Sequence, residues 1–163
     1  MAGNVQRLAV AFPRVILLAS SLWLSVAGLW KFVQPASFMS ALQSHSLLPP
    51  PTHGWLARAV PSLEVSLAAF GLLAACLHAR LRPALLCHSA LFAVFAAYAL
   101  WAHFRPPPAP APCGCGFWDA QAADWAFIAA RNAIAGAVLA TTAAFGLGSQ
   151  SRAGGGRANP RSA

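Results

Sequence analysis

Two cysteines separated by a single glycine form the most reactive group that the sequence offers. Cys113, Gly114 and Cys115 follow a proline-rich stretch at residues 106–112 and lie between two long apolar segments. A disulfide at this spacing is within reach of the usual Cα separation of roughly 4.4–6.8 Å, but it closes a small, strained ring. Strained and exposed disulfides exchange readily. The pair therefore favours redox exchange, with simple loop closure and a metal site that includes His103 as the other interpretations.

The composition indicates that the elements around this pair cross a membrane. Of the 163 residues, 58% are hydrophobic and 9% are charged, whereas soluble domains carry roughly 25% charged residues. A helix needs about 20 apolar residues to span the hydrocarbon core. Four segments satisfy this requirement, at about residues 15–32, 56–79, 84–104 and 122–147. A signal-peptide cleavage after residue 27 is the rival interpretation of the first segment.

These segments predict an all-α fold, an integral membrane four-helix bundle with up-down-up-down topology. We expect one domain over residues 1–148. The Gly-, Ser- and Arg-rich residues 149–163 have the composition of a disordered tail. Gly28, Gly71 and Gly136 are the candidates for close contacts between helices.

The distribution of basic residues predicts which end of the bundle faces the cytoplasm. The net charge is +8, but the basic residues stand singly at the ends of apolar runs, which argues against nucleic-acid binding. Cytoplasmic loops of membrane proteins are enriched in Lys and Arg. Seven basic residues fall on one side: Arg7, Arg14, Arg80, Arg82, Arg152, Arg157 and Arg161. Three fall on the other: Lys31, Arg58 and Arg105.

Both termini are therefore expected in the cytoplasm, in the inner membrane of a cell with a periplasm, and the cysteine pair is expected outside. Tryptophan favours membrane interfaces, and most tryptophans fall near the predicted outer boundary. These are Trp30, Trp55, Trp101, Trp118 and Trp125. Charge and tryptophan placement thus predict the same boundary.

Three charged residues are expected to converge beneath the cysteine pair. Glu64 lies inside the second predicted span, Arg131 inside the fourth, and Lys31 at the outer end of the first. A charge within hydrocarbon is costly and usually finds a partner in the bundle interior. We predict that Glu64 pairs with one or both cations and that Asn132 extends the network. A purely structural ion pair and a site that binds a ligand or performs chemistry both remain open.

The remaining cysteines are expected to be structural. Cys76 and Cys87 flank a tight turn on the cytoplasmic side, where thiols stay reduced. His78 and His88 stand beside them, but the spacing matches no zinc motif, so no metal site is predicted. Small apolar filling is the expected role of both thiols.

The loop after the first span is expected to hold a short helix that begins near Pro35, since proline suits the first turn. One face of this helix would carry Phe38, Met39 and Leu42. His45 and His53 are interpreted as ordinary loop residues because no partner is visible in the sequence.

Several short motifs together resemble the DoxX-like superfamily of membrane proteins. The first span and the following loop carry Gly-Leu-Trp-Lys-Phe at 28–32, then Pro35, Phe38 and Leu-Leu-Pro at 47–49. Pro61, Leu63 and Glu64 fit the start of the second helix, and Arg131 with Asn132 fits the last. The cysteine segment resembles the Cys-Gly-Cys-Phe-Gly signature of the MauE branch, the methylamine-utilisation membrane proteins. In this chain Gly116 precedes Phe117, which reverses that order.

The resemblance implies a four-helix membrane protein that supports maturation of the disulfide-rich small subunit of periplasmic methylamine dehydrogenase, beside a thioredoxin-like partner. We therefore expect a membrane thiol–disulfide redox or maturation factor for an extracytoplasmic partner, either a thioredoxin-like periplasmic protein or a secreted redox-enzyme subunit. Cys113 and Cys115 would be the redox pair. Lys31, Glu64 and Arg131 would hold the site and lower a thiol pKa. No bound cofactor is predicted.

Two alternatives stay open. One is a non-catalytic membrane assembly subunit. The other is a quinone-linked subunit, which the DoxX branch implies, and a quinone would also serve the thiol–disulfide role as electron carrier. A small transporter is a weaker interpretation because inverted repeats are not evident, although Pro61 would be a place to break the second helix.

Overall fold

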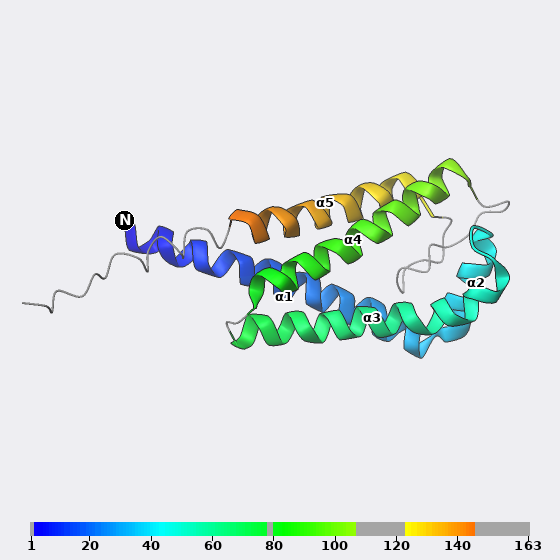
Figure 1. Ribbon diagram of the computed structural model, residues 1–163, viewed down its shortest axis with the longest axis horizontal. Helices are drawn as coiled ribbons and strands as arrows, with labels where there is room; N and C mark the ends of the chain where they lie inside the picture. The colour runs from blue at the N-terminus through cyan, green and yellow to red at the C-terminus, as the bar shows by residue number, and fades with distance from the viewer. Residues whose placement is uncertain (1, 78–79, 107–122, 146–163) are drawn as a thin grey trace, which may run out of the picture.

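The computed structural model describes residues 2–77, 80–106 and 123–145. Within these ranges the chain is helical and contains no strand. The helices are α1 (Ala2–Val33), α2 (Pro35–His45), α3 (Pro50–Leu77), α4 (Leu81–Phe104) and α5 (Trp125–Phe145), shown in Figure 1.

Four of these helices are long and apolar enough to cross a membrane, over Ala11–Val33, Pro50–Leu77, Leu81–Phe104 and Trp125–Phe145. The fold is therefore the expected helical membrane bundle, and the chain is a multi-pass membrane protein. Helix α3 begins at Pro50, ahead of the predicted start near residue 56. Prolines are compatible with the first turn, because the amide hydrogens there have no partner within the helix. Helix α3 also continues through Pro61.

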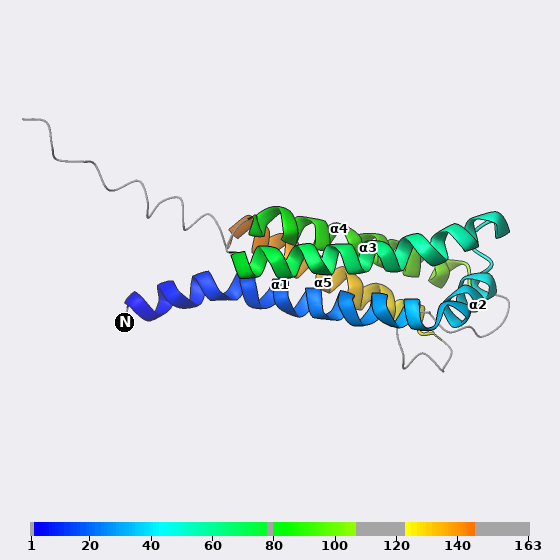
Figure 2. The same ribbon diagram turned by 90° about the horizontal axis from the view of Figure 1, so that it is seen from below.

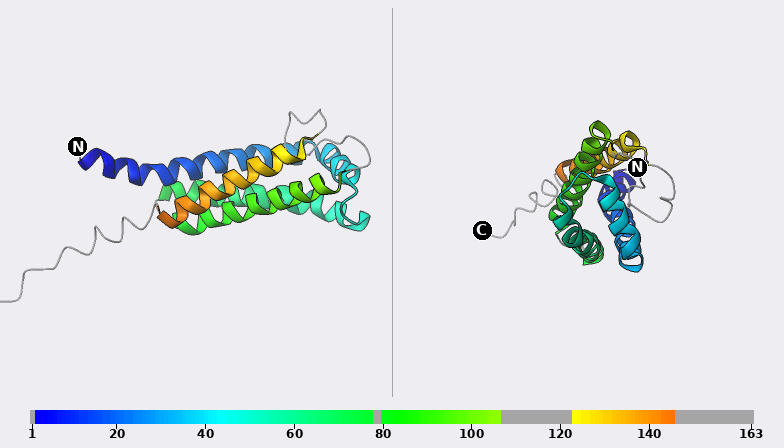
Figure 3. Two further views of the ribbon diagram at one scale, coloured as in Figure 1. Left: turned by 90° about the horizontal axis from the view of Figure 1, so that it is seen from above. Right: turned by 90° about the vertical axis from the view of Figure 1, so that its right-hand side faces the viewer.

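The spanning helices associate as two pairs. Helix α1 packs most extensively against α3, and α4 against α5, while contacts between the pairs are fewer. Figures 1 and 2 show α2 at one end of the bundle, beside the N-terminal end of α3. The end-on view in Figure 3 shows α4 and α5 together on one side of the bundle. The two pairs thus create a seam that runs along the molecule.

A buried histidine joins the two pairs across this seam. His88 on α4 is fully buried, and its Nε2 lies 2.9 Å from the carbonyl oxygen of Leu67 on α3. Because a carbonyl only accepts, Nε2 carries the proton and donates it. The Nδ1 atom then accepts from the Ser20 hydroxyl of α1, 2.9 Å away. One imidazole therefore connects three helices through both of its nitrogen atoms.

The cysteines near the turn between α3 and α4 have a different environment from the one expected. Cys76 and Cys87 are both exposed on the outside of the bundle, so they do not fill the core. Arg80 at this turn has a left-handed backbone, with φ of 55°, and His78 lies outside the described residues.

Gly71 permits the close approach of three helices around His88. A Cβ atom at this position would lie 2.7 Å from His88 Nε2 and would also collide with Ser21 Oγ. Gly28 and Gly136 also lie at helix contacts, where an added Cβ would meet Val65 Cγ2 at 2.9 Å and Ser89 O at 3.3 Å respectively. All three glycines thus occupy positions where a side chain would push helices apart.

We expect Gly71→Ala to lower the free energy of unfolding by about 1–3 kcal/mol, because the added methyl group has no space and the buried imidazole cannot yield. Gly54→Ala is the matched control, since a Cβ there meets nothing within 4 Å. Denaturation of the purified protein in detergent measures both changes. Equal losses in the two variants would contradict this account of Gly71.

Candidate functional site: a polar cavity between the helix pairs

A buried ion pair joins α1 to α3. Lys31 Nζ lies 2.6 Å and 2.7 Å from the two carboxylate oxygens of Glu64, and the side chains are 5% and 2% exposed. Of the two cations expected to pair with Glu64, Lys31 does so. Both carboxylate oxygens receive a charged donor, which is the geometry that a buried charge needs to offset its desolvation.

The backbone around this pair explains its short distances. Gly28 stands almost one turn before Lys31, and a Cβ built on it would lie 3.1 Å from Glu64 Cβ and 3.2 Å from the carbonyl oxygen of Pro61. The missing side chain therefore lets α3 approach α1 closely. The ring of Phe38 on α2 completes the enclosure, with its centroid 5.4 Å from Lys31 Nζ.

Among the described contacts, Arg131 and Asn132 form no hydrogen bond or salt bridge with this ion pair, although both line the same cavity as Lys31 and Glu64. The guanidinium carbon of Arg131 lies 5.5 Å from the ring centroid of Trp23 on α1. Among the described residues, Arg131 forms no salt bridge with a carboxylate. Asn132 is 4% exposed, and its amide has no hydrogen-bond partner within the described ranges. The rotation of α5 directs Arg131 to the aromatic face, so Glu64 is left to Lys31.

A second buried polar contact lies closer to α2 and was missed by the sequence reasoning. His45 is 2% exposed, and its Nδ1 lies 2.7 Å from the hydroxyl oxygen of Tyr98 on α4. The Trp125 ring of α5 packs edge-on against the imidazole, at 4.8 Å between centroids. His45 thus ties α2 to α4 and α5.

The interpretation of His45 and His53 as ordinary loop residues is wrong, since both are buried on helices. His53 Nε2 lies 3.1 Å from the carbonyl oxygen of Leu48. A signal for His45 was present in the spacing: Phe38, Leu42 and His45 recur at one helical face, as buried residues do.

The Lys31–Glu64 pair and the His45–Tyr98 pair line the same cavity, which has a volume of about 190 Å³. Every helix contributes to its wall, and most of the lining is apolar. Its polar members are Lys31, Glu64, His45, Tyr98, Arg131 and Asn132. For comparison, an apolar cavity of about 150 Å³ holds a benzene molecule. The space is therefore large enough for a small organic group.

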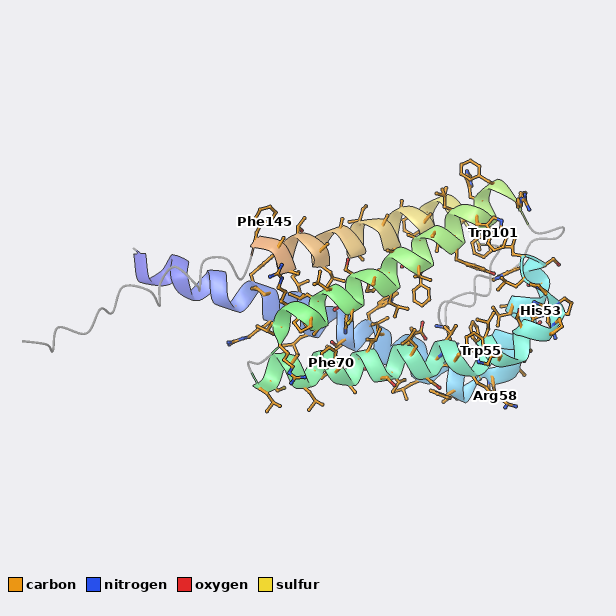
Figure 4. The ribbon with its side chains drawn as sticks, viewed as in Figure 1. His53, Trp55, Arg58, Phe70, Trp101 and Phe145 are labelled. Carbon is orange, nitrogen blue, oxygen red and sulfur yellow. The ribbon has the colours of Figure 1, made fainter. Side chains whose placement is uncertain are left out.

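The cavity lies in the half of the bundle that carries α2. Figure 4 shows Trp55 and Trp101 at the α2 end and Phe145 at the opposite end. Trp55 is 70% and Trp101 is 40% exposed, as expected for rings at a membrane interface. Cys113, Cys115 and Trp118 lie outside the described residues. The segment that contains them leaves α4 after Phe104 and rejoins α5 at Trp125.

Comparison with protein families gives a decisive match. A family model described as methylamine utilisation protein MauE matches residues 8–147. This chain belongs to the MauE family. The match covers the four spanning helices of this MauE protein, together with α2 and the cysteine pair. No curated protein and no solved structure shows a match to the chain.

We expect Glu64→Ala to lower the free energy of unfolding by about 3–5 kcal/mol, because it leaves the Lys31 ammonium group buried without a counter-charge. The double variant Lys31→Met with Glu64→Leu removes both charges and is expected to regain most of that loss. A double-mutant cycle in detergent, built from Lys31→Met, Glu64→Leu and the double variant, measures the coupling. Additive losses from the two single changes would show that the pair contributes no interaction of its own.

Proposed function

We propose that this MauE-family protein is a membrane thiol–disulfide factor that supports maturation of an extracytoplasmic partner. The observation that carries the proposal is the location of the cavity. Cys113 and Cys115 are tethered to the ends of α4 and α5, which are the ends that hold Tyr98 and Trp125. An extended chain reaches at most about 3.3–3.6 Å per residue, so the thiols stay within roughly 35 Å of those anchors.

The proposed exchange uses the cysteine pair as a carrier of two electrons. When the pair is a disulfide, a partner thiolate attacks one sulfur, and a mixed disulfide forms and then resolves. The partner ends with a new disulfide, and Cys113 and Cys115 end as thiols with the two electrons and two protons. A second carrier must then reoxidise the pair, and a membrane quinone or another thiol protein has the chemistry to do so.

The buried polar groups support this role through their position beneath the anchors. The Lys31–Glu64 pair is internally neutral, so the positive charge of Arg131 is the one left to favour a thiolate nearby. The partner of the exchange is proposed to be a thioredoxin-like protein or a secreted redox-enzyme subunit with its own cysteines. Family membership supports a link to methylamine utilisation.

The proposed orientation places the cysteine pair outside the cytoplasm, with both termini inside. After mild reduction, a membrane-impermeant maleimide is expected to label Cys113 and Cys115 fully in intact spheroplasts. A Ser151→Cys change in a cysteine-free background is the control, and it should label only after lysis. If only the control is labelled in intact spheroplasts, the orientation is the opposite of the proposed one.

Cys113→Ser and Cys115→Ser are each expected to abolish complementation of a deletion strain and to leave the partner with free thiols, because either change removes the disulfide. The matched control is Cys76→Ser with Cys87→Ser, which removes two exposed thiols at the other end of the bundle and should change neither readout. The partner's thiol content, measured by gel shift after alkylation, checks both. Full complementation by the cysteine-pair variants would exclude the redox role.

A non-catalytic assembly subunit is the second candidate. It is favoured by the completeness of the Lys31–Glu64 contact, which has the geometry of a structural cross-link between helices. The two functions differ in whether they require the thiols of Cys113 and Cys115. An assembly subunit retains its effect on partner abundance when both cysteines of the pair are serine.

A further inference from the structure

Arg131 and Asn132 lie in the cavity wall and have no hydrogen-bond or salt-bridge partner among the described residues, and the proposed thiol exchange does not account for Asn132. The chain contains three acidic residues. Glu64 is taken by Lys31, and Asp124 accepts the Phe127 amide at the start of α5, at 3.0 Å. Within the described ranges, no acid is therefore left for Arg131. The remaining acid, Asp119, lies outside them.

The net charge of the cavity lining indicates the charge of the ligand that would neutralise it. Lys31 and Arg131 bring two positive charges and Glu64 brings one negative charge, so the lining carries one net positive charge. A cation in a low-dielectric interior attracts an anion far more strongly than it does in water. The aromatic face of Trp23 stabilises Arg131 in part, but it does not neutralise the charge.

The donors of this pair point to a carboxylate. A guanidinium group presents two parallel N–H donors that match the two oxygens of a carboxylate. The buried Asn132 amide, which is 4% exposed and also lines the cavity, offers a further N–H donor. A single carboxylate carries one negative charge, which equals the excess on the cavity lining.

The apolar side chains of the cavity wall indicate what the remainder of the ligand, beyond the carboxylate, consists of. Apart from the polar groups already named, the cavity is lined by aliphatic and aromatic side chains such as Leu24, Phe92 and Ile128. Such walls cannot replace the hydration shell of an inorganic anion, but they suit a hydrocarbon tail. At about 190 Å³, the cavity accepts the head and first carbons of a chain, and the remainder would extend toward lipid.

We propose that the cavity binds a lipid-soluble carboxylic acid, with the carboxylate held by Arg131 and Asn132 and the hydrocarbon chain among the apolar side chains of the seam. A long-chain fatty acid is the simplest member of this class. The site shares Arg131 with the proposed thiol exchange but uses no cysteine, so the two proposals can be tested separately.

Bromine quenches tryptophan fluorescence on contact, and Trp23 and Trp125 line the cavity. A brominated long-chain fatty acid, added to the full-length protein in detergent at about pH 8 where the carboxylate is ionised, is therefore expected to quench at lower concentration than the brominated alcohol of equal chain length. Arg131→Gln should weaken acid binding by at least about tenfold, since it removes a charged donor pair. Alcohol binding should be unchanged.

Three further variants make the result specific. Asn132→Asp is nearly isosteric and should also weaken acid binding, because it places a negative charge beside the ligand. Arg131→Lys keeps the charge and should bind more tightly than Arg131→Gln. Arg58→Gln, an exposed residue on α3, is the charge-matched control and should bind as the wild type does.

Equal quenching by acid and alcohol, or equal acid binding by wild type and Arg131→Gln, would overturn the proposal. Binding of the acid by Asp119→Asn but not by the wild type would also overturn the proposal. It would show that Asp119 is the counter-ion of Arg131 in the wild-type protein. The variant with both Cys113 and Cys115 changed to serine should bind the acid normally. Failure of the redox proposal and failure of this one are therefore separate outcomes.

Discussion

The contact between Lys31 and Glu64 determines the geometry of the half of the bundle that carries α2. A lone carboxylate among apolar helices requires a cation at hydrogen-bonding distance, and this requirement fixes how α1 and α3 approach each other. Gly28 makes the approach sterically feasible, and Phe38 of α2 covers the ammonium group. The cavity takes its shape from this arrangement, because one wall of it is the ion pair itself.

The polar groups around His88 and those around the cavity differ in how many of their hydrogen-bond donors have partners. Around His88, the two imidazole nitrogens have partners on neighbouring helices, and the helices approach so closely that Gly71 has no space for a methyl group. Around the cavity, Arg131 and Asn132 keep donors that no described residue accepts. Partners on both nitrogens of a buried ring suit a structural contact, although Ser21 Oγ beside it has no partner among the described residues. Unused donors that face a cavity suit a binding site.

The sequence predicted those features that depend on composition or on a rule about charge. Apolar runs of sufficient length revealed the four spanning helices, and the placement of Glu64 within a span required a basic partner. It did not reveal that Arg131 would lie on Trp23, because that depends on the rotation of α5 about its axis. His45 was misjudged for a related reason, since its partner Tyr98 is 53 positions away along the chain and meets it only in the folded bundle.

Near His88 the imidazole holds the two helix pairs together, and beside the cavity the contact between His45 and Tyr98 ties α2 to α4. Trp23 is 38% exposed and also lines the cavity, so its ring lies between the outside of the bundle and Arg131. A hydrophobic molecule that entered the proposed site past this ring would come from the surrounding lipid and would not cross the aqueous rim.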